Sequence, residues 1–98
     1  MDKPYYVYMV RCQNDAIYTG IALDVDKRIE KHNSKKGSRS VIAHGIPVEL
    51  QCMIHQPNKS QALKLEAKIK KFSKKDKELF IDIMNNHFKE THETSDDN

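Results

Sequence analysis

The chain has 98 residues, 32% of them charged, and a net charge of +3, so we expect one small domain whose site is a surface cleft rather than a large internal cavity. No apolar run approaches the roughly 20 residues that span a membrane, and the N-terminus lacks a signal-peptide pattern, which predicts a cytoplasmic protein without a membrane segment. Cys12 and Cys52 are too few for a zinc site or a disulfide framework and are expected to be free thiols.

The charge is unevenly distributed along the chain. Residues 1–88 hold 16 Lys and Arg against 10 Asp and Glu, whereas residues 89–98 hold one against four. A basic body is compatible with a polyanionic partner, although charge alone fits an ordinary soluble surface equally well. We therefore expect a single domain over residues 1–88, followed by an acidic, disordered C-terminal tail over residues 89–98.

A β-hairpin is expected at the start of the chain. Residues 5–11 and 16–21 are rich in aromatic and β-branched side chains, and the polar residues 13–15 between them are a turn signal. Gly20, near the end of the second strand, is typical of a bulge or of a close approach to the backbone.

A helix and a basic loop are expected next. Asp24 is a good N-cap for a helix over residues 25–35, which carries Arg28 and His32 one turn apart. Residues 33–40 then read as a basic loop, which contains Lys36, Gly37 and Arg39.

The second half of the chain predicts one strand and two helices. Alternation over residues 48–54 predicts a third strand with one buried face, made of Val48, Leu50, Cys52 and Ile54. Ser60 should cap a helix to about residue 72, with an apolar stripe of Ala62, Leu65, Ile69 and Phe72. Ser73 should cap a last helix, with inward Leu79, Phe80, Ile83 and Met84. The expected fold is α+β, a small three-stranded mixed or antiparallel sheet flanked by helices in the order β-β-α-β-α-α.

Four side chains in the first third could carry chemistry. Tyr8 and Tyr18 lie on the two hairpin strands, where their phenols could meet at one surface. Alternatively, both could be half-buried aromatic residues of the sheet whose hydroxyls are hydrated. Arg28 could bind a phosphate through its planar fork, and His32 could donate to that phosphate or move a proton. The alternative is a solvated arginine and a histidine at the edge of the core.

Glu66 and a run of lysines stand out in the second half. Glu66 flanks an apolar helical stripe, where a carboxylate is costly unless it is paired or binds a metal. It could equally be an exposed residue paired with Lys70, one turn later. Residues 59–77 hold eight lysines against two acidic residues, which fits either phosphate binding or a solvated helix face.

The order of these features resembles the GIY-YIG nuclease superfamily. Val7-Tyr8-Met9 stands at the place of the first motif and Tyr18-Thr19-Gly20 at the place of the second, and they keep the tyrosines and the glycine. Later features follow in family order: Lys27-Arg28, His32, and Leu65-Glu66 within a lysine-rich helix. The similarity covers roughly residues 5–80, and the sequence resembles in particular the small stand-alone UPF0213 proteins.

The resemblance implies roles for the candidate residues. Tyr8 would help to activate water, and Tyr18 would lie beside it. Arg28 would stabilise charge on the phosphate, and His32 would assist proton transfer or bind phosphate. Glu66 would hold one divalent metal, Mg²⁺ or Mn²⁺.

The resemblance also implies an activity and a partner. The chain would be a metal-dependent endonuclease, a phosphodiester hydrolase, that acts on nucleic acid, above all DNA, in repair or processing; a monomer is expected. Gly20 and Gly37 would be structural. Phosphate contacts are assigned to Lys36, Arg39, Lys70, Lys71, Lys74 and Lys75.

Two other functions fit the same residues. A non-catalytic nucleic-acid-binding module would keep the fold and bind in a salt-dependent manner without turnover. A protein-interaction domain would use the acidic tail to dock on a partner or to shield the lysines.

Overall fold

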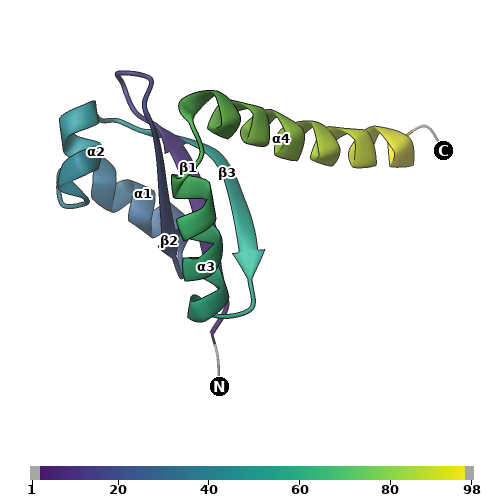
Figure 1. Ribbon diagram of the computed structural model, residues 1–98, viewed down its shortest axis with the longest axis horizontal. Helices are drawn as coiled ribbons and strands as arrows, with labels where there is room; N and C mark the ends of the chain where they lie inside the picture. The colour runs from purple at the N-terminus through teal and green to yellow at the C-terminus, as the bar shows by residue number, and fades with distance from the viewer. Residues whose placement is uncertain (1–2, 97–98) are drawn as a thin grey trace.

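The computed structural model describes the backbone of residues 3–96 and the side chains of residues 3–86. It contains three strands and four helices (Figure 1): β1 Tyr5–Arg11, β2 Ile17–Ala22, α1 Val25–Asn33, α2 Arg39–His44, β3 Glu49–Gln56, α3 Lys59–Lys70 and α4 Lys74–Asp96. The strands form one antiparallel sheet in the order β2-β1-β3. The predicted α+β fold is confirmed.

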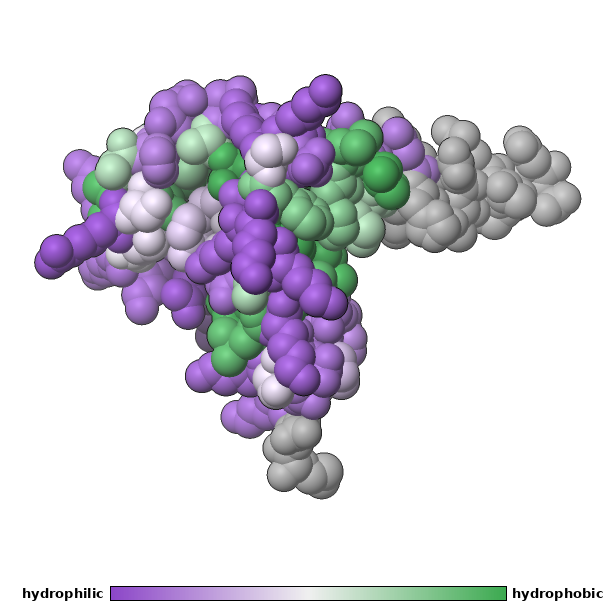
Figure 2. Space-filling model, in the orientation of Figure 1, coloured by the Kyte–Doolittle hydropathy of each residue, from purple (hydrophilic) through white to green (hydrophobic). Residues whose placement is uncertain are grey.

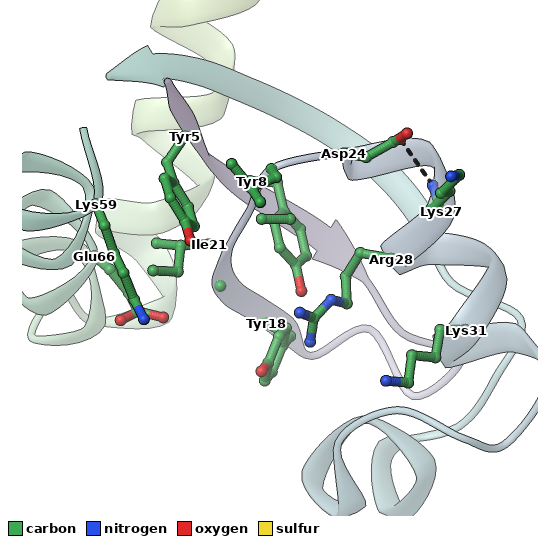
Figure 3. Close-up of a pocket in the computed structure, with 13 residues that line it drawn as sticks. Tyr5, Tyr8, Tyr18, Ile21, Asp24, Lys27, Arg28, Lys31, Lys59 and Glu66 are labelled. Carbon is green, nitrogen blue, oxygen red and sulfur yellow. Dashed lines mark hydrogen bonds between the residues drawn. The ribbon is translucent and has the colours of Figure 1, made fainter. Parts of the chain in front are cut away.

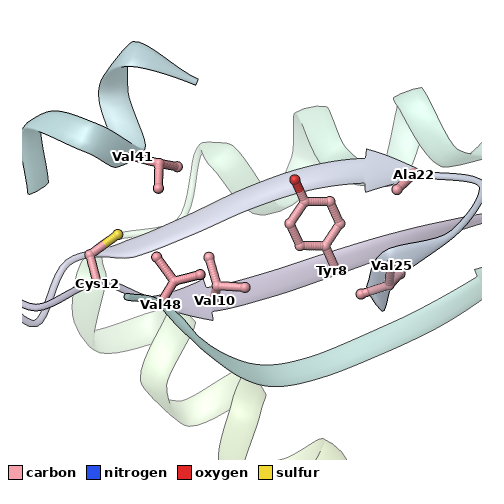
Figure 4. Packing of buried hydrophobic residues seen from close by; sticks show 7 residues of the cluster. All are labelled: Tyr8, Val10, Cys12, Ala22, Val25, Val41 and Val48. Carbon is pink, nitrogen blue, oxygen red and sulfur yellow. The ribbon is translucent and has the colours of Figure 1, made fainter. Parts of the chain in front are cut away.

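Strand β1 is the centre of the molecule and is covered on both faces. Its residues from Val7 to Val10 are all at most 1% exposed, because helices pack against both sides of the sheet. Tyr8 and Val10 belong to the core that α1 and α2 cover (Figure 4), whereas Val7 and Met9 belong to the core that α3 and α4 cover. The side-chain alternation of a strand therefore divides β1 between two cores.

The turn of the hairpin sets the register that the site needs. The amide of Asp15 donates to the carbonyl of Cys12 over 2.9 Å, and the side chain of Asn14 accepts from the amide of Ala16 over 3.0 Å. Asp15 has a φ of 75°, a conformation that Asp tolerates better than most residues. The resulting register places Tyr8 directly opposite Gly20, with Tyr18 two residues away on the same face.

The prediction of one buried face on β3 was wrong. A bulge lies opposite Met9 and Val10, because Cys52 pairs with Met9 while Leu50 pairs with Val10. The extra residue between them turns Leu50 to the opposite face from Cys52, and Leu50 is 39% exposed at the sheet edge.

Two helix boundaries differ from the prediction, and one short helix was not predicted. Helix α1 ends at Asn33, before Lys35 adopts a φ of 66°. Residues 39–44, expected to begin in a loop, form the short helix α2, whose N-cap is Ser38. The cap of α3 is Asn58 rather than Ser60, because the side chain of Asn58 accepts from the amide of Gln61 over 2.9 Å.

Helix α4 begins as predicted but packs differently. Ser73 caps it by accepting from the amide of Asp76 over 3.1 Å. Leu79 and Ile83, expected inside, are 56% and 57% exposed, because the helix leaves the sheet at one end and buries Ile81 instead (Figure 1). Figure 2 shows apolar surface where α4 begins, beside a largely polar surface over α3.

Helix α4 continues to Asp96, past the expected end near residue 88. Its side chains beyond residue 86 lie outside the described residues, so the acidic tail over residues 89–98 stays a prediction. Among the residues that the structure describes, no helix is both long and apolar enough to cross a membrane.

Candidate active site

A cleft of about 560 Å³ lies over the outer edge of β2, with α1 on one side and α3 on the other. Figure 3 shows its side chains, which come from both faces of the hairpin. Tyr8 and Tyr18 belong to the face that α1 covers, whereas Tyr5 and Ile21 pack toward α3. The lining residues are Tyr5, Tyr8, Tyr18, Gly20, Ile21, Ala22, Leu23, Asp24, Lys27, Arg28, Lys31, Lys59 and Glu66.

Tyr8 forms the floor of the cleft. Its side chain is 1% exposed, and its hydroxyl lies 2.9 Å from Nε2 of His32. The half-buried ring of Tyr18 lies beside it, with 6.3 Å between the ring centroids. A Cβ on Gly20 would lie 2.7 Å from the Tyr8 hydroxyl oxygen, so a glycine at this position lets the phenol cross the backbone of β2.

His32 lies beneath the cleft and reaches it only through Tyr8. Its side chain is 1% exposed, and Nδ1 has no hydrogen-bond partner among the described residues. A Cβ on Gly37 would lie 2.2 Å from that Nδ1, so the loop after α1 can close over the imidazole only with a glycine there. Both predicted structural glycines therefore support one hydrogen-bonded pair.

Burial sets the protonation of this pair. Burial raises the pKa of Tyr8 well above its ordinary value; nearby Tyr18 and Glu66 also raise it, and Arg28 opposes them. Burial lowers the pKa of His32, as do the positive charges of Arg28 and Lys31. At neutral pH the resting pair is a neutral phenol and a neutral imidazole, in which the Tyr8 hydroxyl can donate to Nε2.

Arg28 and Glu66 stand on opposite walls of the cleft. Arg28 is exposed on α1, and its guanidinium points toward the two tyrosines (Figure 3). Glu66 projects from α3 with its side chain 16% exposed, beside the buried Ala62 and Ile69. Oε2 of Glu66 also lies 3.4 Å from Nζ of Lys70. Glu66 therefore forms the predicted ion pair within the helix and lines the cleft as well.

A divalent metal would have one protein carboxylate here. The described residues contain no group of three or more His, Cys, Asp or Glu side chains that could hold a metal ion. Asp24 also lines the cleft, but its Oδ1 accepts from the amide of Lys27 as the cap of α1. Glu66 alone fits a hydrated ion such as Mg²⁺, which commonly binds through one or two carboxylates, with water and substrate phosphate as its other ligands.

The structure separates the predicted phosphate-binding residues from the cleft. Within the described residues, none of Lys36, Arg39, Lys70, Lys71, Lys74 and Lys75 lines it. Lys74 instead pairs with Asp15 over 2.6 Å. The cations that do line it with Arg28 are Lys27, Lys31 and Lys59. For the first two the sequence held a signal, because they lie within one turn of Arg28 on the same helix.

Comparisons with known proteins show which family and fold the chain resembles. A family model described as the GIY-YIG catalytic domain matches residues 4–79. A UPF0213 protein of Fusobacterium nucleatum is 43% identical over 77 residues, which cover 79% of this chain and 76% of the relative. One of Vibrio cholerae is 40% identical over 82 residues, 83% of this chain and 80% of the relative. The solution NMR structure of a UPF0213 protein from Bacillus halodurans matches with a TM-score of 0.53 and 35% identity, covering 82% of this chain and 84% of that one.

Proposed function

Since the chain belongs to the GIY-YIG catalytic domain family, a family of nucleases, we propose that it is a metal-dependent endonuclease that hydrolyses phosphodiester bonds in DNA during repair or processing. The observation that carries the proposal is the buried hydrogen bond between Tyr8 and His32, at the floor of a cleft with Arg28 and Glu66 on opposite walls. This arrangement offers a proton path, a phosphate ligand and a metal ligand around one open space.

Proton transfer begins at Tyr8. Because burial disfavours a free phenolate, Tyr8 acts as a relay: its oxygen takes a proton from water while its own proton passes to Nε2 of His32. The resulting hydroxide attacks the phosphorus atom, the bond from phosphorus to the leaving oxygen breaks, and solvent protonates that oxygen. His32 can accept the proton because its imidazole starts neutral, and its lowered pKa favours return of that proton to solvent after the bond has broken. Tyr18, half-buried beside Tyr8, can hydrogen-bond the attacking water or the phosphate.

Charge on the phosphate is stabilised from the two walls. The guanidinium of Arg28 can donate to two phosphate oxygens at once. Its electrostatic attraction for the phosphate becomes stronger as substrate excludes water from the cleft. Glu66 would hold the divalent metal, which supplies Lewis-acid stabilisation of the phosphate and the leaving oxygen when it is bound. GIY-YIG nucleases generally use divalent metals, and Glu66 is the acidic lining side chain that does not cap a helix.

A nuclease assay tests the proposal. Purified protein is incubated with branched, duplex and single-stranded DNA and with RNA, in Mg²⁺ or Mn²⁺ and in EDTA. We expect cleavage that needs metal and that falls by at least about 100-fold in Glu66→Ala and in Arg28→Ala. Glu30→Ala, which removes an exposed carboxylate from α1 outside the cleft, is the matched control and should retain activity. Sustained cleavage by the Glu66 and Arg28 variants would refute the assignment.

A second function has one observation in its favour. The raised pKa of Tyr8 works against a phenolate base, as expected for a module that has kept the fold and lost turnover. Such a module would bind nucleic acid with a steep salt dependence and give no metal-dependent product. Wild type and Glu66→Ala that are equally inert on every substrate would favour it.

A further inference from the structure

Two lysines line opposite walls of the cleft. Lys31 lies on α1, one turn after Arg28, and its ammonium group extends on the same side as the Arg28 guanidinium, toward Tyr18 (Figure 3). Lys59 lies in the first turn of α3 and lines the opposite wall. Among the side chains of residues 3–86, neither lysine forms an ion pair or a hydrogen bond with its ammonium group.

The spacing along α3 places the backbone of Lys59 about two turns before that of Glu66. The two positions are seven apart, so their Cα atoms are separated by roughly 10.5 Å along the helix axis and lie on the same face. Glu66 forms its ion pair with Lys70 instead, so the charge of Lys59 is not neutralised there. A phosphate held at Glu66 and Arg28 would therefore leave Lys59 available for another phosphate of the same strand.

The other lysines of α3 provide a contrast. Lys64 and Lys68 line a separate hollow, together with Gln56, Gln61, Leu65 and Ala67. Lys27 lines the cleft, but its ammonium group points away from Arg28 and Tyr18 in Figure 3. Position, rather than local lysine density, singles out Lys31 and Lys59.

We propose that Lys31 and Lys59 hold the phosphates on either side of the scissile one, so that the nucleic-acid strand crosses the edge of β2 from α1 to α3. The partner is a sugar-phosphate backbone, bound without sequence preference, because an ammonium group recognises charge rather than base edges. Both lysines are positioning residues: they contact phosphates that do not react, so they contribute equally to ground-state and transition-state binding. This inference rests on the proposed function for the location of the scissile phosphate.

Binding in EDTA tests the inference without requiring cleavage. A short fluorescein-labelled DNA oligonucleotide is titrated with wild type, Lys31→Ala, Lys59→Ala and the double variant at several salt concentrations, followed by fluorescence anisotropy. Each single variant should reduce the slope of log affinity against log salt by about 0.7 to 0.9, and the double variant by about twice that. Lys59→Arg should keep the wild-type slope, because the charge remains. Lys64→Ala and Lys68→Ala are matched controls from α3 and should keep it as well.

Steady-state kinetics supply the second measurement. With a cleavable substrate, both alanine variants should raise KM by roughly tenfold or less and leave kcat within about twofold, as expected when uniform binding is lost. The assay is run above the pH at which His32 titrates, because the charge of Lys31 also lowers the pKa of His32. Slopes for Lys31→Ala and Lys59→Ala equal to those of the Lys64 and Lys68 controls would overturn the inference. If the wild type never cleaves, the proposed function fails, while the EDTA slopes still decide the role of the two lysines.

Discussion

Gly20 is the residue at which the packing of the site can be tested most directly. A Cβ at this position would lie 2.7 Å from the hydroxyl oxygen of Tyr8, 2.8 Å from its Cζ and 3.0 Å from its Cε1. The phenol is 1% exposed and is hydrogen-bonded to His32, so moving the ring would disturb its packing and break that hydrogen bond. Gly20→Ala must therefore displace either the ring or the backbone of β2.

The expected cost follows from the contacts. Forcing one methyl group into a well-packed site typically destabilises a protein by roughly 1–3 kcal/mol. Gly20 does not have a positive φ, so alanine would not be disfavoured by the backbone itself. Without the contact to Tyr8, alanine in a strand should be neutral or slightly stabilising. The whole cost should thus depend on the Tyr8 ring.

A double-mutant cycle separates the two effects. The free energy of unfolding is measured by urea denaturation for wild type, Gly20→Ala, Tyr8→Leu and the double variant. Leucine lacks the three Tyr8 atoms that the new methyl group would meet, so Gly20→Ala should cost less than about 0.5 kcal/mol in that background. Equal costs in both backgrounds would refute the reasoning, because the loss would then not come from the contact with Tyr8.

Two further predictions concern protonation and the anchoring of α4. Burial lowers the folded-state pKa of His32 below the unfolded value of about 6.5, so the stability from this residue is present above that pH and is lost as the pH falls toward the folded-state pKa. His32→Asn should therefore flatten the plot of unfolding free energy against pH in this window. An unchanged plot would contradict the assignment. Arg11 forms a bidentate pair with Glu78 over 2.8 and 2.5 Å, so Glu78→Ala should destabilise the protein by roughly 1 kcal/mol, less at high salt, in thermal unfolding. Asp82→Ala, an exposed change on the same helix, is the control, and an equal loss there would show that the ion pair is not the cause.

Local patterns were sufficient for the hairpin, for the beginnings of α1 and α4, and for the family. Aromatic and β-branched runs separated by Asn14 and Asp15 predict the two strands, because strand propensity and turn chemistry depend on neighbouring residues. The caps Asp24 and Ser73 were correctly located for the same reason. The ordered residues from Tyr8 to Glu66 indicated the GIY-YIG family, which the family model confirms over residues 4–79.

The errors arose where a residue responds to a distant part of the chain. Leu50 was expected inside, but the bulge that turns it outward depends on how β3 pairs with β1, some 40 residues earlier in the sequence. Leu79 and Ile83 have helical spacing typical of a buried stripe, yet α4 buries Ile81 and leaves these two exposed as it runs away from the sheet. A periodic pattern identifies an apolar face without saying whether anything covers it.

The sequence by itself determined which chemical groups the site could use: two phenols, an imidazole, a guanidinium and a carboxylate, in an order typical of a nuclease family. Only the tertiary structure decided that His32 lies behind Tyr8 rather than beside a phosphate, and that Lys31 and Lys59, rather than Lys71 and Lys75, line the cleft. The physical reason is that the site forms where α1 and α3 pass the same edge of β2. Side chains that meet there are separated by up to several tens of residues along the chain, so their distances follow from packing rather than from sequence spacing.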